Sequence, residues 1–322
     1  MKKILLTAFA LCIFLNGQAQ EKKSKFTIPI GSWNAKIIAL DNLYPTYLAD
    51  PLGVRFEVSS QNFIYSDFEH KDEINQGGDY LGKLTPMTGA RFSLFKFTPK
   101  NNPNIGVEMD LGIATPLVMR AGNHDLIATD GIYYLGIVAK PTEWLVLRFM
   151  KHHICTHLGD EFSGGTVKSP VDYDPNVTQL PVRDDFILSA AVKPLYFLNK
   201  ASLNILQIYG DFGFFLPGVD FMGRRQNKPN RTAYLSYQGG IELEYYFPNK
   251  FIGGIFSAVN VSAYQLNAFS PNISVSGGYI FPQEKYSQRL RVGVNYYNGR
   301  SLSNQFYNRK EKFLAFYVAI DF

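Results

Sequence analysis

The chain has 322 residues, of which 46% are hydrophobic and 15% aromatic, and its formal net charge is +5. That charge is too small, without any basic tract, to indicate nucleic-acid binding. Downstream of the N-terminal segment no apolar run reaches the roughly 18 residues that a membrane-spanning helix requires. Of the two cysteines only Cys155 lies outside this segment, so no internal disulfide is expected in the mature chain.

Residues 1–19 have the pattern of a secretory signal peptide. Lys2 and Lys3 precede an apolar run, and small residues follow near Ala19, where cleavage is expected. Residues 20–52 are weakly patterned, and we interpret them as a periplasmic lead-in with short strands at most. The exported part with a regular pattern therefore begins at residue 53.

Residues 53–322 alternate between apolar and polar side chains with a period of two. In one segment the apolar set is Ile105, Val107, Met109, Leu111 and Ile113, and the set between is Gly106, Glu108, Asp110 and Gly112. One apolar face opposite a charged face predicts strands of a membrane barrel whose interior is polar. About 12 such segments occur, at 53–65, 88–98, 105–119, 130–141, 144–158, 185–197, 203–216, 232–247, 251–266, 271–282, 288–298 and 313–322.

The connections between these segments alternate between short and long, as in bacterial outer-membrane barrels. The sequence thus predicts an all-β fold, a transmembrane antiparallel β-barrel of about 12 strands, in the bacterial outer membrane. A wide aqueous channel needs about 16 strands or more. We therefore expect the charged interior to be cross-linked and plugged, which disfavours a large nonspecific porin.

The last segment ends in Phe322 and carries Leu314, Phe316, Val318 and Ile320 on the same face. A barrel must pair its final strand with its first, because unpaired backbone groups in hydrocarbon cost several kcal/mol. A terminal aromatic on such a strand resembles the signal that outer-membrane assembly machinery reads. That machinery and outer-membrane lipid or lipopolysaccharide are the expected partners, and no nucleic acid is expected.

The stretch from Trp144 to Glu161 ends in a row of reactive side chains. Alternation places His153, Cys155 and His157 on the apolar, lipid-facing side, just before a loop that opens at Leu158 and contains Asp160 and Glu161. An imidazole can take the proton of a neighbouring thiol, so Cys155 is a candidate nucleophile. His153 or His157 would be its base. The carboxylates that could orient the base are Asp160, Glu161, Asp184 and Asp185.

Two other interpretations of this row remain open. His153 and His157 lie roughly 13 Å apart along a regular strand, so one metal ion could not bind both without a bulge. A metal site would then need acidic ligands from elsewhere, and neither a metal nor a cofactor is identified by the pattern. Alternatively, these are interfacial polar residues at the barrel mouth, hydrogen-bonded to a loop or to lipopolysaccharide.

Residues 153–161, HICTHLGDE, resemble the HxSSHLGDE signature of a bacterial family, domain of unknown function 1207. Its "LADP" segment is matched by Leu48–Pro51, and the similarity spans roughly the whole mature chain. The resemblance implies an outer-membrane barrel without an established activity. The first hypothesis for function is a non-enzymatic role in envelope integrity, assembly or small-solute passage.

His153 and Cys155 also resemble the lipid-facing His-x-Ser pair of the outer-membrane phospholipase A and lipid A deacylase families. This looser resemblance implies the alternative hypothesis, an outer-leaflet lipid acyl hydrolase. The sequence departs from that pattern at two positions, with Cys155 in place of serine and Thr156 in place of the following asparagine.

Overall fold

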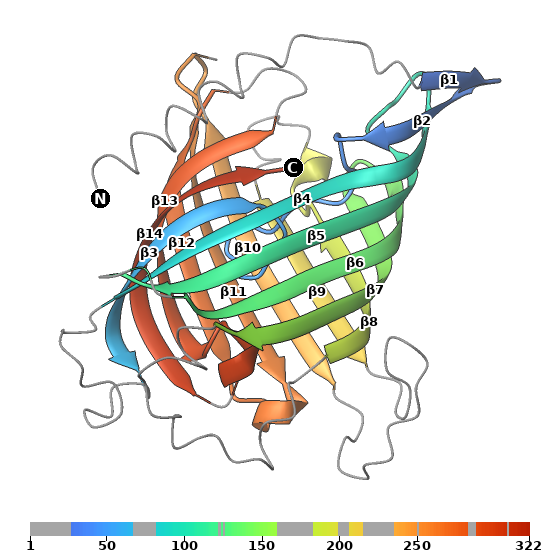
Figure 1. The fold of residues 1–322 in the computed structure, drawn as a ribbon. Helices are drawn as coiled ribbons and strands as arrows, with labels where there is room; N and C mark the ends of the chain where they lie inside the picture. The colour runs from blue at the N-terminus through green and yellow to red at the C-terminus, as the bar shows by residue number, and fades with distance from the viewer. Residues whose placement is uncertain are drawn as a thin grey trace, which may run out of the picture.

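The computed structural model describes residues 27–66, 82–121, 124, 126–159, 183–198, 206–214, 235–249, 251–282, 288–307 and 309–322. Twelve antiparallel strands form a closed barrel, which confirms the fold predicted from the alternation (Figure 1). They are β3 (Phe56–Ser66), β4 (Gly82–Pro99), β5 (Gly106–Arg120), β6 (Leu126–Thr142), β7 (Leu145–Leu158), β8 (Arg183–Val192), β9 (Leu206–Phe214), β10 (Ser236–Tyr246), β11 (Gly254–Tyr264), β12 (Asn272–Ile280), β13 (Arg289–Arg300) and β14 (Lys310–Asp321).

Each strand pairs with its neighbours in sequence, and β14 pairs with β3 to close the barrel. The register of the closing pair places Val318 opposite Val58 and Ile320 opposite Phe56. Closure leaves no strand edge along the wall, which is the requirement for a sheet in hydrocarbon. Because the strand number is even, β3 begins and β14 ends at the same end of the barrel. The short β4–β5 and β6–β7 connections lie at this end too.

The two faces of the wall differ sharply in chemistry. Outward-pointing side chains are large and apolar, including Ile113, Ile137, Phe149, Leu188, Ile241, Ile255 and Phe316, which are 43–61% exposed. Many inward-pointing side chains are charged and several form ion pairs, although apolar residues such as Met150 and Ile187 also point inward. Examples are the ion pairs Arg91–Asp110 at 2.8 Å and Arg291–Asp321 at 2.9 Å. The period of two therefore separates an apolar exterior from a cross-linked lumen.

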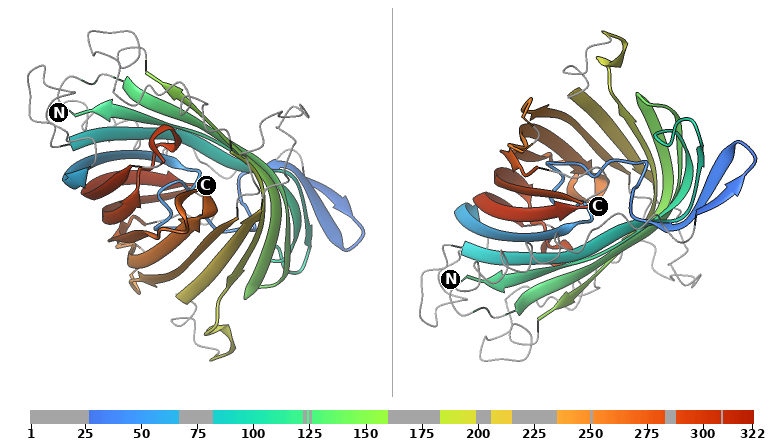
Figure 2. Two further views of the ribbon diagram at one scale, coloured as in Figure 1. Left: turned by 90° about the horizontal axis from the view of Figure 1, so that it is seen from below. Right: turned by 90° about the horizontal axis from the view of Figure 1, so that it is seen from above.

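Residues 41–54, which we name the lumen segment, enter the barrel at the end with short turns. Leu43, Tyr44, Tyr47 and Leu48 are at most 5% exposed there. The wall provides carboxylates that accept hydrogen bonds from this segment. Leu43 N donates to both carboxylate oxygens of Glu108 at 2.9 and 3.0 Å, and Leu48 N donates to Glu242 at 2.5 Å. The lumen segment thus lies inside the ring of strands (Figure 2).

The opposite, outer end of the lumen is covered by the connection between β13 and β14. It contains a short 3₁₀ turn, η4 (Asn304–Phe306), whose Asn304 N donates a 2.8 Å hydrogen bond to Asp130. Phe306 packs there against Val118 and Ala128. A cavity of about 90 Å³ remains beside the lumen segment, lined by Arg148 among others, which is room for a few water molecules.

Two further strands lie outside the barrel, β1 (Thr27–Ile30) and β2 (Trp33–Ala39). They form a hairpin that pairs with the last part of β4 and projects sideways from the wall (Figures 1 and 2). The expected signal peptide, residues 1–19, falls outside the described residues. No helix in the described ranges is both long and apolar enough to cross a membrane.

Candidate functional site

The candidate site lies on the outward face where β6, β7 and β8 run side by side. On β7, Leu147 and Phe149 are 44% and 43% exposed, whereas Arg148 and Met150 are buried in the lumen. The same alternation carries the odd-numbered residues from Lys151 to His157 onto the outward side. His153 and Cys155 therefore belong to the face that carries the apolar wall.

His153 is held by a carboxylate on the neighbouring strand. The register pairs His153 with Asp184 of β8, and His153 Nδ1 lies 2.8 Å from Asp184 Oδ1. On the other side, the ring of Tyr133 stacks on the imidazole at a centroid distance of 4.3 Å. Although both His153 and Asp184 point outward, they are only 6% and 3% exposed. The imidazole is thus fixed in orientation.

Cys155 occupies the next outward position of β7, one pleat repeat beyond His153. Its side chain is partly buried, and Sγ lies 3.7 Å from the carbonyl oxygen of Gly131, the residue opposite on β6. A Cβ at position 131 would lie 2.9 Å from this sulfur, closer than real Cβ contacts allow. Glycine at position 131 therefore makes the room in which the thiol sits.

Lys151 is the outward residue on the other side of His153, nearer the middle of β7. Its Nζ lies 3.5 Å from Asp184 Oδ1 and 4.9 Å from the centre of the Phe186 ring. The ammonium group thus shares the carboxylate of Asp184 with the imidazole. A cation, an imidazole and a thiol follow one another at alternate positions along one strand.

The other predicted site residues do not join this cluster in the described structure. His157 is exposed at the end of β7, one repeat beyond Cys155. Asp160 and Glu161 lie outside the described residues, so their proposed role as orienting carboxylates stays a prediction. Of the two alternatives on β8, Asp184 is the partner of His153. Asp185 points into the lumen, where it pairs with His152 at 2.8 Å.

A metal centre receives no support from the described residues. Among them, no three His, Cys, Asp or Glu side chains lie close enough together to hold one ion. The separation of His153 and His157 along an extended strand explains why this pair alone cannot act as a chelate.

The sequence alone does not distinguish Asp184 from the other three carboxylates that could pair with His153. The alternation of β8 holds a signal for it, because Phe186 and Leu188 are outward residues and Asp184 shares their parity. The alternation shows on which face of the sheet a β8 residue lies, but not which β7 residue it stands beside. Which β8 residue stands opposite His153 depends on the register across a long connection.

The sequence profile of the family described as "Protein of unknown function (DUF1207)" matches residues 32–322. The chain belongs to this family. Both resembling segments, Leu48–Pro51 and residues 153–161, lie within the matched range. No curated protein matches the chain.

Solved structures with a similar course of the chain are outer-membrane proteins. Outer membrane phospholipase A from Escherichia coli is 10% identical, with a TM-score of 0.49 over 87% of this chain and 93% of its own. LpxR from Salmonella typhimurium is 11% identical, with a TM-score of 0.36 over 83% of this chain and 99% of its own. The NanC porin is 9% identical, with a TM-score of 0.40 over 83% and 100%. Similarities this low carry no information about a shared activity.

The arrangement of His153, Asp184 and Cys155 has a definite chemical capacity. When Nδ1 donates its proton to the carboxylate, Nε2 is the nitrogen that can accept one. A thiol that loses its proton to this nitrogen becomes a nucleophile, and the carboxylate stabilises the imidazolium that forms. The outward face of the wall therefore carries an imidazole oriented by a carboxylate, with a thiol at the next outward position of the same strand.

Proposed function

We propose that the protein spans the bacterial outer membrane and hydrolyses an acyl ester of an outer-leaflet lipid, with Cys155 as nucleophile, His153 as base and Asp184 as the orienting carboxylate. The observation that carries the proposal is the buried His153–Asp184 pair on the apolar, outward side of the wall, beside a thiol.

The chemistry of the two barrel faces supports the membrane location. Large apolar side chains cover the outward face, whereas ion pairs such as Arg91–Asp110 and Arg291–Asp321 lie inside. A water-soluble barrel would not expose so extensive an apolar outer face. The predicted signal peptide agrees with export. We also propose that outer-membrane assembly machinery binds the last strand, which ends in Phe322.

An ionisable pair on the lipid-facing side calls for an explanation. Removing a carboxylate and an imidazole from water is costly, and such residues within membrane segments most often mark a functional site. The lumen already supplies a polar face for structural ion pairs. His153 and Asp184 lie instead on the outward face, where a group carried by a lipid molecule would reach them.

The position of the site along the strand points to the outer leaflet. β7 begins at Leu145, near the short β6–β7 turn, and strands need roughly 9–11 residues to span the hydrocarbon layer. His153 and Cys155 are therefore at the outer boundary, where the ester bonds of lipids lie. Lys151 is positioned to attract the anionic groups of such a lipid.

The proposed reaction has two steps, the formation of a thioester on Cys155 and its hydrolysis. His153 takes the thiol proton as Sγ bonds to the ester carbonyl carbon, and the same imidazole then protonates the departing alcohol oxygen as the C–O bond breaks. Water next attacks the thioester, releasing the fatty acid and restoring the thiol.

A non-enzymatic role in the envelope is the second candidate. The lumen segment is hydrogen-bonded across the barrel interior to Glu108 and Glu242, which favours a structural role over conduction. Passage of a small solute would require residues 41–54 to leave their carboxylate partners.

The test is fatty-acid release by the purified full-length protein from phospholipid or lipopolysaccharide in mixed detergent micelles. We expect Cys155→Ala to reduce release to the background level. Cys155→Ser should retain measurable activity, because a hydroxyl beside the same imidazole is also a nucleophile. Each variant is first checked for the heat-dependent gel mobility of a folded barrel.

Full activity in the Cys155→Ala variant would end the catalytic proposal. A wild-type protein that is folded but inactive on both lipid classes would favour the structural candidate instead. Conductance across planar bilayers would point to solute passage, the possibility that the filled lumen disfavours.

A further inference from the structure

The hairpin of β1 and β2 extends the barrel wall beyond its circumference. β3 pairs with residues 82–87 of β4, whereas β2 pairs with the later part of β4, from Ser93 to Pro99. The hairpin therefore branches from β4 where β3 has ended its pairing. Its tight turn pairs Ile30 with Trp33, and Gly31 adopts the positive φ of 54° that this turn needs.

The two faces of the hairpin differ as strongly as those of the barrel. Cross-strand partners in an antiparallel sheet share a face, so the pairs of β1, β2 and β4 define two sets. The apolar set is Ile28, Ile30, Trp33, Ala35, Ile37, Phe95 and Phe97. The opposite set contains Thr27, Asn34, Lys36 and Lys96.

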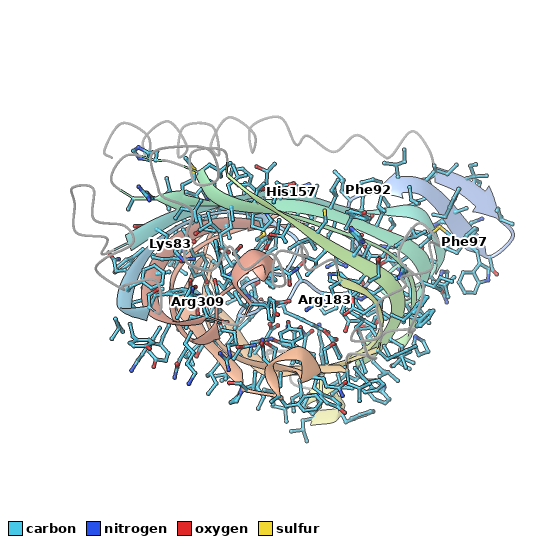
Figure 3. All side chains as sticks on the ribbon, turned by 60° about the horizontal axis from the view of Figure 1, so that its bottom comes forward. Lys83, Phe92, Phe97, His157, Arg183 and Arg309 are labelled. Atoms are coloured by element: carbon cyan, nitrogen blue, oxygen red, sulfur yellow. The ribbon has the colours of Figure 1, made fainter. Side chains whose placement is uncertain are left out.

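The apolar face of the hairpin is exposed, and it is continuous with the outward wall. Ile28, Ile30 and Trp33 are 51%, 54% and 43% exposed. Phe95 and Phe97, which are 47% and 38% exposed, connect this face to the outward side of β4. In Figure 3, Phe97 lies beside the hairpin, on the outer side of the wall.

The level of the hairpin matches the inner boundary of the membrane. β4 has 18 residues, more than the roughly 9–11 that span the hydrocarbon layer, and β2 of the hairpin pairs with its final part, from Ser93 to Pro99. Trp33 stands at the turn, and tryptophan is enriched at membrane–water boundaries. The exposed Lys100 adjoins this turn, where its backbone N donates a 2.9 Å hydrogen bond to the Ser32 carbonyl.

The polar side of the hairpin is tied to the lumen segment. Lys36 Nζ lies 2.8 Å from Asp41 Oδ2, and Lys96 Nζ lies 3.1 Å from the same oxygen. Burial acts to raise the pKa of the Asp41 carboxyl, but the two ammonium groups outweigh it and hold that pKa below its ordinary value. These contacts fix the base of the hairpin, and its apolar face points to the same side as the outward face of β4.

We propose that this apolar face lies in the inner leaflet of the outer membrane, against phospholipid acyl chains, and anchors the barrel sideways in that leaflet. The inference rests on the proposed membrane location but not on the proposed hydrolase activity. Continuity with the lipid-facing wall identifies the occupant as lipid, since the same acyl chains that cover Phe95 and Phe97 would continue onto Trp33 and Ile28.

The experiment uses quenching of tryptophan fluorescence by lipids with brominated acyl chains. The chain has two tryptophans, so Trp144→Phe leaves Trp33 as the single reporter. Two matched proteins carry the reporter elsewhere, in a Trp33→Phe, Trp144→Phe background. Asn34→Trp reports the polar face of the same hairpin, and Phe149→Trp reports the lipid-facing middle of the barrel wall. Each is reconstituted in vesicles of phosphatidylethanolamine and phosphatidylglycerol.

We expect brominated lipid to reduce Trp33 emission at least roughly twofold, as for a side chain among acyl chains, and to leave the Asn34→Trp reporter much less affected. Introducing Ile28→Glu and Ile30→Glu into the Trp33 reporter should restore most of the emission. The Phe149→Trp reporter should be quenched with or without these two substitutions.

Failure of the inference and failure of the membrane location give different results. If Phe149→Trp is quenched while Trp33 is no more quenched than Asn34→Trp, the hairpin lies outside the bilayer and the inference is overturned. Cover by a second copy or by a periplasmic protein would also give this result. If Phe149→Trp itself is not quenched, the location of the barrel in lipid is wrong, and the inference is lost with it.

Discussion

Two histidine–aspartate pairs lie next to each other between β7 and β8, on opposite faces of one sheet. His152 pairs with Asp185 toward the lumen, and His153 pairs with Asp184 toward the outside. In both pairs Nδ1 lies 2.8 Å from the carboxylate, and all four residues are less than 9% exposed. Local geometry alone does not distinguish them.

Their surroundings differ. The inward pair has the guanidinium of Arg183 3.2 Å from Asp185, among many other lumen charges (Figure 3). The outward pair adjoins the apolar wall, where Phe149 stacks on Phe186, and a thiol occupies the next position. A polar interior accounts for the first pair as part of its network. The second pair has a thiol at the next outward position and lies on the apolar face that we propose contacts lipid, which is why we assign function to it.

Removing one histidine from each pair should separate these two roles. We expect His153→Ala to lower kcat/KM for lipid hydrolysis by about 10²–10⁴-fold, because the general base is lost. His152→Ala removes only an inward partner and should leave kcat/KM within about threefold of the wild type, with a stability loss of about 1–3 kcal/mol. Initial rates of fatty-acid release and unfolding midpoints measure the two effects.

Equal losses of activity in both variants would remove the distinction between the faces. The pairs would then act together as one structural brace, and the outward pair would have no separate catalytic meaning. Activity in both variants at the wild-type level would exclude His153 as the base.

The lumen network should behave as a stability element. Glu108 accepts hydrogen bonds from Leu43 N and, at 2.5 Å, from Ser93 Oγ, and it is 3% exposed. Glu108→Ala leaves the buried Leu43 N without its acceptor, whereas Ser93 Oγ can still donate to Asn42 Oδ1 at 3.2 Å, so we expect a loss of about 1–3 kcal/mol. The outward-pointing Leu147→Ala keeps every polar group paired and should cost less. Guanidinium unfolding of detergent-solubilised protein compares them, and a larger loss for Leu147→Ala would contradict the lumen's role.

The fold could be predicted from the sequence because alternation is a local property. Within each strand the alternation indicates which side chains point outward, as for Val107 and Glu108 on β5, whose exposed fractions are 45% and 3%. Twelve strands with this alternation, in a sheet that must close on itself, form a barrel. The row of His153 and Cys155 could be found in the same way, because both residues lie on one strand.

The rest depends on relations between distant segments. The partner of His153 is set by the register between β7 and β8, to which no local pattern refers. The lumen segment has no period of two, and its buried Leu43, Tyr44, Tyr47 and Leu48 are matched by wall carboxylates far along the chain. Weak patterning made it resemble a plain lead-in. Its hydrogen bonds to Glu108 and Glu242 are visible only in three dimensions.

The smallest expected effect concerns the space around the sulfur. At Gly131 a new Cβ would lie 2.9 Å from Cys155 Sγ, whereas at Gly210, on the outward side of β9, the nearest atom is the Gln238 carbonyl oxygen at 3.8 Å. Gly131→Ala must turn the thiol away from its present position, and small displacements of reacting groups are costly. We expect kcat/KM to fall about tenfold.

Gly210→Ala is the matched control, because it adds the same methyl group to the same face where there is room for it. It should leave hydrolysis unchanged, and both variants should fold, since alanine suits a strand at least as well as glycine. The rate of thiol alkylation by a maleimide in detergent reports independently whether the sulfur has moved. If Gly131→Ala changes the alkylation rate but not hydrolysis, the sulfur is not the reacting atom. The outward pair would then be, like the inward one, an internal support of the wall.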